Sequence, residues 1–179
     1  MGWGIIRKIP AVIIRPIAAF REISGESPFH ALLYFGLLFL FYIILSFIAF
    51  ALQFVSLGVS QNIPSDLPIL LLPHAMIQML LLIYLAIYIV WIHVWVFALG
   101  GRKDFGQTVK SILYGLTPLL LLGYLSQIFL VAGFWSLALI ALGIRELQGI
   151  SIGRAIVATV IPTALFVISI LVLFFALVL

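Results

Sequence analysis

The sequence predicts an all-α membrane protein: a bundle of five transmembrane helices preceded by a short amphipathic interfacial helix. The first reason is composition. Of the 179 residues, 66% are hydrophobic and only 8% are charged, with a mean hydropathy of +1.40, whereas soluble domains carry about 25% charged residues. A domain of this length has too small an interior to hide so much Leu, Ile, Val and Phe from water. Lipid must therefore surround most of its surface.

The second reason is the placement of the polar residues. The stretch Gly100–Pro118 lies between two long apolar runs and holds three of the nine basic residues, Arg102, Lys103 and Lys110. Such a polar loop is where a membrane chain turns at a water-facing surface, and its Lys and Arg residues mark the cytoplasmic side. The net charge of +4 then reflects orientation and attraction to anionic head groups, not a nucleic-acid partner. The sequence has no cysteine, which excludes disulfides and cysteine metal sites.

We predict residues 1–28 as a basic interfacial segment. Pro10 and Pro16 interrupt any long helix, and the segment lacks the continuous apolar core of a cleavable signal peptide. Pro16 suits a first helical turn, so Pro16–Ile23 is predicted as a short helix in the membrane interface, with its apolar side towards lipid. A mobile tail is the alternative. Four cations of this segment are predicted to contact lipid phosphates: Arg7, Lys8, Arg15 and Arg21.

A membrane domain of five spans is predicted over residues 29–179. The first two spans are residues 29–57 and 69–99, each longer than the ~20 residues that a bilayer crossing needs. The loop between them, residues 58–68, contains no Lys or Arg. Trp91 and Trp95 lie towards the end of the second span, as residues of an aromatic belt would.

The third and fourth spans are harder to separate. One interpretation is a single helix from residue 105 to residue 143, and the other is two spans joined by a tight turn near Ala132–Gly133. A single helix of that length would far exceed one bilayer crossing. We therefore predict a third span over residues 105–130, bent by Pro118, and a short fourth span over residues 134–147.

The distribution of Lys and Arg gives the orientation. With a last span over residues 152–179, five spans place all nine Lys and Arg residues on one side of the membrane. The positive-inside rule makes that side cytoplasmic, so the N-terminus is predicted inside and the C-terminus outside. The nine cations lie in residues 1–28, 100–110 and 144–154.

Signatures of enzymes are mostly absent from the sequence. It contains no HExxH, Walker A or GxGxxG motif, which are motifs of metalloproteases and nucleotide-binding enzymes. His30, His74 and His93 each lack the partner at i+3 or i+4 that a helical metal site needs, so they are interpreted as interfacial histidines. No carboxylate lies clearly at mid-membrane, which argues against a charge-translocating pathway. We expect no catalytic residue, no cofactor and no metal.

Two small groups of residues stand out nonetheless. Ser111 and Gly115 are four residues apart, a spacing that brings a membrane helix close to a neighbour. Arg145 is predicted either to face inward and pair with a carboxylate or to lie in a solvated turn, and both alternatives stay open. The candidate functional or structural polar cluster is Asp104, Tyr114, Pro118, Arg145, Glu146 and Arg154. Arg102 and Lys103 complete the predicted lipid-phosphate contacts.

Two blocks of the sequence resemble a known family. The first comprises Gly100-Gly101, Phe105, Thr108, Tyr114 and Pro118, and the second is IRELQGIS at residues 144–151 followed by Gly153-Arg154-Ala155. Arg15-Pro16 with Phe20 is similar to that family's opening motif before its first span. Together they resemble the prokaryotic branch of the Yip-domain family (Ypt-interacting proteins), over nearly the whole chain. The resemblance implies five spans, a cytoplasmic N-terminus and a short C-terminus outside.

What the resemblance implies about function is a non-enzymatic membrane protein that organises membrane or acts in trafficking. Eukaryotic members are Golgi and endoplasmic-reticulum proteins that bind Rab-type GTPases in vesicle traffic. They carry a longer soluble N-terminal region, which these residues do not contain. The short chain and compact loops resemble prokaryotic members, which implies the plasma (inner) membrane of a prokaryote. The lipid bilayer and anionic head groups are the expected partners, with a homo-oligomer or another membrane protein as a further partner.

Two other hypotheses are kept open. A small solute or ion transporter or channel would have its site between spans three and five, where Pro118 and Pro162 kink the helices and broken helices can expose backbone groups to a cavity. The lack of intramembrane charge argues against it. An intramembrane enzyme would use His74 or His93, although neither has a partner residue at catalytic spacing.

Overall fold

The computed structural model describes residues 4–56 and 63–178, and in this part the chain is α-helical without a strand. Four of the helices are long and apolar enough to cross a membrane: α3, α4, α7 and α8. The all-α membrane class is therefore confirmed, whereas the predicted count of five spans is not. The helices are α1 (Ile5–Ile14), α2 (Pro16–Ile23), α3 (Pro28–Ser56), α4 (Ile63–Ala98), α5 (Phe105–Gly115), α6 (Thr117–Leu122), α7 (Phe129–Gln148) and α8 (Ile152–Val178).

The N-terminal segment packs on the protein, and this corrects the prediction of an apolar face turned to lipid. Helix α2 has the predicted bounds, and Pro16 occupies its first turn. Its apolar face is buried, however, and Phe20 lies against Gly143 of α7. Helix α1 was not predicted, because Pro10 lies inside it. Packing of Val12, which is fully buried, stabilises this short helix, since tertiary contacts usually outweigh local propensity.

The third predicted span is not one bent helix. It divides at Leu116 into α5 and α6, with proline in the first turn of α6, where its missing N–H leaves no helical bond unmade. The chain turns at residues 123–128, not near Ala132–Gly133, and α7 already begins at Phe129. Gly133 is tolerated inside α7 because a glycine within a helix weakens it by only about 1 kcal/mol.

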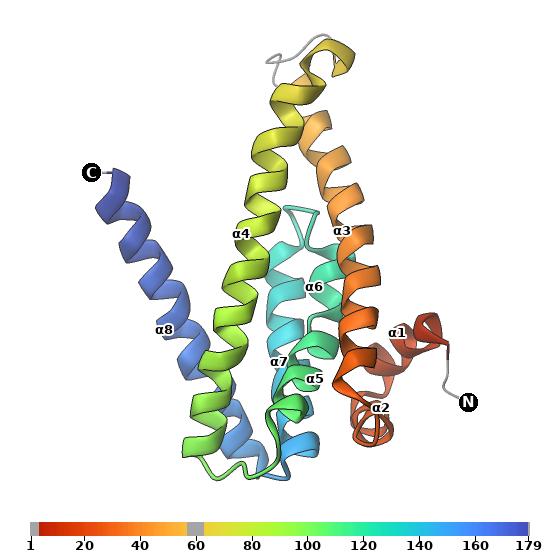
Figure 1. The fold of residues 1–179 in the computed structure, drawn as a ribbon, viewed down its shortest axis with the longest axis vertical. Helices are drawn as coiled ribbons and strands as arrows, with labels where there is room; N and C mark the ends of the chain where they lie inside the picture. Colours follow the sequence, from red (N-terminus) through yellow and green to blue (C-terminus); the bar gives the residue numbers. More distant parts are fainter. Residues whose placement is uncertain (1–3, 57–62, 179) are drawn as a thin grey trace.

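Helices α3 and α4 form the tallest pair (Figure 1). Residues 57–62 of the predicted loop lie outside the described residues, and α4 begins at Ile63 instead of residue 69. Large apolar side chains cover the outer faces of this pair, as in Leu72 and Met79, each 66% exposed. Such a surface is stable only in hydrocarbon, which agrees with the membrane class.

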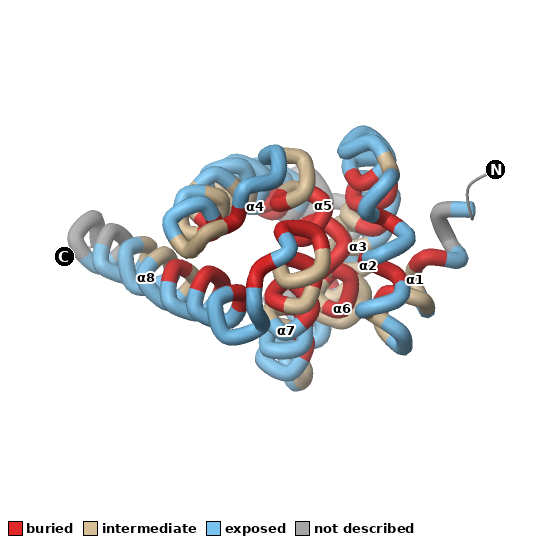
Figure 2. Tube along the Cα trace, turned by 90° about the horizontal axis from the view of Figure 1, so that it is seen from below, coloured by how far each residue is buried: buried red, intermediate tan, exposed pale blue. Residues whose placement is uncertain are grey.

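The buried residues gather around α5 and α7. Figure 2 shows this centre in red, with exposed helix surfaces around it. Gly115 of α5 lies against the backbone of Ile140 in α7, which confirms the predicted close approach of the third segment to a neighbour. Gly149, with φ of +70°, ends α7, and α8 then packs on α4 through Ala155 and Ala158 before the two helices separate (Figure 1).

The segments α3, α4, α5–α6, α7 and α8 alternate in direction. As Figure 1 shows, the N-terminal helices and the two loops at residues 99–104 and 149–151 lie at one end of the molecule, and the described C-terminal end of α8 lies towards the other. The turn at residues 123–128 lies at an intermediate height, below the tips of α3 and α4. The basic loops predicted to share one side of the membrane thus share one end of the fold.

Candidate functional site

A largely buried ion pair joins α1 to the segment before α3. The ammonium group of Lys8 donates to both carboxylate oxygens of Glu26, at 2.7 Å to Oε1 and 2.5 Å to Oε2. The hydroxyl of Tyr114, from α5, lies 3.2 Å from both Lys8 Nζ and Glu26 Oε2. Tyr114 is fully buried, and the lysine and glutamate side chains are 11% and 22% exposed. An ion pair this withdrawn from water needs such a third hydrogen-bonding group, because burying charge is unfavourable.

A second lysine also attaches the N-terminal segment to α5. Lys110 of α5 is 1% exposed, and its ammonium donates to the backbone carbonyls of Ile23, Ser24 and Glu26 at 3.2, 2.8 and 2.9 Å. The first two of these carbonyls belong to the C-terminal end of α2, where a helix leaves its last carbonyls without partners and a cation is favoured. We call Lys8, Glu26, Lys110 and Tyr114 the N-terminal clasp.

Two of the residues predicted as a polar cluster pair with each other and with α2. Glu146 accepts from Arg21 Nε at 2.8 Å through Oε2, and its Oε1 lies 3.5 Å from Arg145 Nε. The carboxylate is largely covered, whereas the Arg21 side chain is 69% exposed. Arg145 therefore pairs with its neighbour on α7, whereas the contact between Arg21 and Glu146 holds α2 over the end of α7.

The other members of the predicted cluster lie apart from this group. Tyr114 belongs to the N-terminal clasp, and Pro118 is buried in α6. Asp104 is the N-cap residue of α5, but its side chain makes no capping hydrogen bond. Arg154 is exposed, and its guanidinium lies beside Gly100. The structure thus does not assemble the six predicted residues into one site.

One polar network was not predicted from the sequence. Gln148 of α7 donates to the hydroxyl of Thr108 at 3.0 Å and to the carbonyl of Asp104 at 3.3 Å, and it accepts from the backbone N–H of Lys103 at 3.2 Å. The same threonine lies 2.9 Å from Nδ1 of His93 in α4. The network links α4, α5 and α7. His93 therefore has a hydrogen-bonding partner inside the protein, in contrast to the interfacial position expected for it.

His74 also has internal partners. Its Nε2 lies 3.2 Å from the hydroxyl of Ser46 in α3 and 3.4 Å from Nε2 of Gln78 one turn away. Both His74 and Gln78 are buried, and this cluster links α3 to α4. Among the described residues, no group of three or more His, Cys, Asp or Glu side chains is arranged to hold a metal ion.

Several cations remain exposed at the basic end, the end of the molecule that holds the N-terminal helices and the loops at residues 99–104 and 149–151. Five of them form no ion pair with another described residue: Arg7, Arg15, Arg102, Lys103 and Arg154. The Arg102 guanidinium lies 4.7 Å from the ring centre of Phe97, a cation–π contact that leaves its donors available. Lys8, by contrast, lies inside the N-terminal clasp, so the structure places it away from the surface predicted to meet lipid phosphate.

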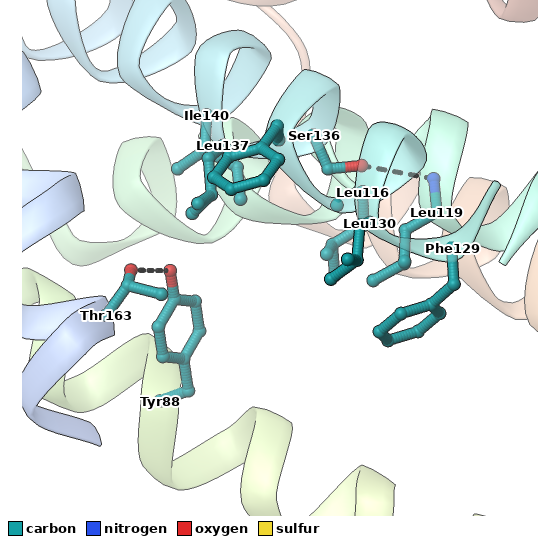
Figure 3. A pocket seen from close by; sticks show the side chains of 11 residues that line it. Tyr88, Leu116, Leu119, Phe129, Leu130, Ser136, Leu137, Ile140 and Thr163 are labelled. Atoms are coloured by element: carbon teal, nitrogen blue, oxygen red, sulfur yellow. Dashed lines mark hydrogen bonds between the residues drawn. The ribbon is translucent and has the colours of Figure 1, made fainter. Parts of the chain in front are cut away.

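Two adjoining cavities lie between the long helices. One, of about 300 Å³, is bounded by α4, the α5–α6 segment, α7 and α8 (Figure 3). The other, of about 480 Å³, shares Tyr88, Leu119 and Thr163 with it and extends to Phe35 of α3. Their position between α6 and α8 is where a transporter site was predicted, but their walls are almost wholly apolar. Such an apolar wall does not favour the transporter alternative.

Comparison with known proteins places the chain in one family. The family model described as the Yip1 domain matches residues 11–174, which run from the middle of α1 almost to the end of α8. No curated protein and no solved structure matches the chain. Since the matched region covers nearly all of the sequence, the resemblance inferred from the two motif blocks is confirmed, and the chain belongs to the Yip1 domain family.

Proposed function

We propose that this protein is a non-enzymatic scaffold that organises the plasma membrane of a prokaryote by gathering anionic lipids at its basic end. It crosses the membrane five times, with the N-terminus in the cytoplasm and the C-terminus outside. The proposal is supported by family membership, by the exposed cations of one end, and by the internal pairing of the polar residues at the centre.

The third crossing in this proposal is the α5–α6 segment. Residues 105–122 cover about 27 Å at 1.5 Å per helical residue, close to the ~30 Å of the hydrocarbon core. The break at Leu116 lies where α3 and α7 pack around it, and a broken helix inside a membrane needs such protein surroundings. Because the five segments alternate in direction, all nine Lys and Arg residues then lie on the cytoplasmic side of the membrane.

The exposed cations are the observation that carries the scaffold proposal. Arg102 and Lys103 lie on the loop at residues 99–104, Arg154 lies beside this loop in the first turn of α8, and no described carboxylate pairs with them. Each basic residue near an anionic membrane surface contributes about 1 kcal/mol of attraction. A protein whose exposed cations gather at one end is suited to collecting anionic lipid head groups.

The test uses the full chain in vesicles of phosphatidylcholine with a minor fraction of phosphatidylglycerol. Enrichment of phosphatidylglycerol around the protein is measured by energy transfer to a labelled lipid, and vesicle shape by electron microscopy. Arg102→Gln, Lys103→Gln and Arg154→Gln are expected to lower the enrichment, each by about fivefold. Glu22→Gln, at an exposed carboxylate of α2, is the control and should not lower it.

Two results would overturn the proposal. One is an enrichment and a vesicle shape that do not change when all three cations are neutralised. The other is a flux of ions or small polar solutes well above that of protein-free vesicles, which would favour the transporter alternative. Folding of each variant is checked by its helical circular dichroism, so that a misfolded variant is not mistaken for a loss of lipid binding.

A further inference from the structure

We propose that the two adjoining cavities between α3, α4, α6, α7 and α8 bind one acyl chain of a membrane lipid. This inference needs the membrane location of the chain, and it does not depend on the scaffold role or on the basic end. It assigns a ligand class to a space that five segments of the bundle enclose between them.

The joined space extends across the bundle. The linings of the two cavities share five residues, so the spaces adjoin, and the joined space reaches from Ile140 on α7 to Phe35 on α3. Even the larger part, of about 480 Å³, has room for only about one turn of a helix, since a helix with its side chains is about 10 Å across. A longer stretch of helix from a second copy therefore exceeds this volume, whereas a hydrocarbon chain has room in it.

The chemistry of the wall is apolar. No charged residue and no histidine occurs among the described residues that line either cavity. Two polar pairs on the wall are hydrogen-bonded: Tyr88 and Thr163 join their hydroxyls at 2.7 Å, and Ser136 accepts from the N–H of Leu119 at 3.1 Å. Figure 3 shows both pairs. The other polar side chains on the wall are Tyr42 and Tyr84, and a wall this apolar favours apolar ligands over water.

The surroundings supply such a ligand. Leu130 and Phe134 stand at the margin of the smaller cavity and are 69% and 70% exposed, so this margin faces hydrocarbon in the membrane. Helix α8 diverges from α4 towards its C-terminal end (Figure 1), and its residues Phe166, Val167 and Ile170 line the larger cavity. An empty space of this size is unfavourable because its walls lose packing contacts. A lipid tail from the bilayer restores those contacts.

Gly133 provides a way to fill the cavity. It lines the smaller cavity, and a Cβ atom added there would meet no other atom within 4 Å. A larger side chain such as leucine therefore meets no clash at its Cβ, and we expect it to occupy part of the space. Gly36, in the middle of α3, is a matched control, because it too has open space around an added Cβ but lines neither cavity.

The test places the full chain in vesicles of phosphatidylcholine that carries a diazirine midway along one acyl chain. After illumination, the labelled residues are mapped by mass spectrometry. We expect labelling of the inner wall at Leu119, Leu137 and Ile140 in addition to lipid-facing residues such as Leu72 and Val172. Gly133→Leu is expected to reduce inner-wall labelling at least fivefold and to spare the lipid-facing residues, whereas Gly36→Leu should change neither.

Three outcomes would overturn the inference. The first is an inner wall that stays unlabelled while Leu72 and Val172 are labelled. The second is inner-wall labelling that persists unchanged in Gly133→Leu. The third is a cross-link from the inner wall to a second copy of the chain when photoreactive leucine is incorporated into the protein. Variants that neutralise the basic end should keep full inner-wall labelling, so failure of the scaffold proposal is distinguishable.

Discussion

The Lys8 ammonium and the Glu26 carboxylate form a two-oxygen ion pair, at 2.7 and 2.5 Å, between a helix that lies beside the bundle and the segment that enters it. The Tyr114 hydroxyl completes the contact from α5. Three parts of the chain, separated by 18 and 88 positions along the sequence, thus meet at one nearly buried point. The first predictions concern this N-terminal clasp.

Replacing Lys8 by methionine should destabilise the protein by about 2 kcal/mol. Removing one partner of a fully buried ion pair costs about 3–5 kcal/mol, and water reaching the 22% exposed Glu26 reduces that loss. The measurement is the free energy of unfolding of the full chain in mixed micelles. Arg7→Met is the control, since Arg7 is exposed on the same helix and should change stability by no more than about 0.5 kcal/mol. Equal effects of the two substitutions would contradict the prediction.

Replacing Lys110 by methionine should loosen the attachment of α2. The substitution removes three hydrogen bonds from an ammonium group to backbone carbonyls, and bonds to charged groups contribute about 1.5–3 kcal/mol each. We expect amide hydrogen exchange in residues 16–27 to accelerate at least tenfold, which corresponds to about 1.4 kcal/mol. Lys103→Met, at an exposed position, should leave that exchange unchanged. Unaltered protection in Lys110→Met would show that the lysine is dispensable there.

Replacing Gly115 by alanine should separate α5 from α7. An added Cβ would lie 2.5 Å from the Ile140 side chain and 2.9 Å from its backbone nitrogen, and a backbone atom cannot move aside easily. Overpacking of this kind costs about 1–3 kcal/mol. Gly36→Ala, in open space, should instead stabilise its helix by about 0.5–1 kcal/mol. Thermal unfolding of both variants measures the contrast, and a Gly115→Ala protein as stable as the original would refute the close packing.

The sequence predicts those features of the fold that depend on neighbouring residues. Pro16 at a first turn and an apolar face give α2 with its observed bounds, and long apolar runs give α3, α4 and α8. The break at Leu116 and the turn at 123–128 differ from the prediction. The turn was expected near Gly133, but a glycine signals a turn only where packing does not hold it in a helix.

The candidate site is predictable to a lesser extent. A lysine near the start of an apolar helix is expected to extend towards head groups, but Lys110 turns inward to the α2 carbonyls. The partners of Lys8, Glu26 and Gln148 are distant in sequence, so no local pattern contains them. The cavities are formed by five segments together, and their existence depends on how α8 separates from α4.

The number of membrane crossings can be tested because the natural sequence has no cysteine. Single cysteines are introduced as Gln127→Cys, at the exposed turn between α6 and α7, and as Lys103→Cys, at the basic end. In a five-span protein, a membrane-impermeant maleimide added to intact cells should label Gln127→Cys, whereas Lys103→Cys should react only after the membrane is opened. If α5, α6 and α7 instead enter and leave the bilayer on the cytoplasmic side, Gln127→Cys will stay unlabelled in intact cells, and the chain crosses the membrane three times.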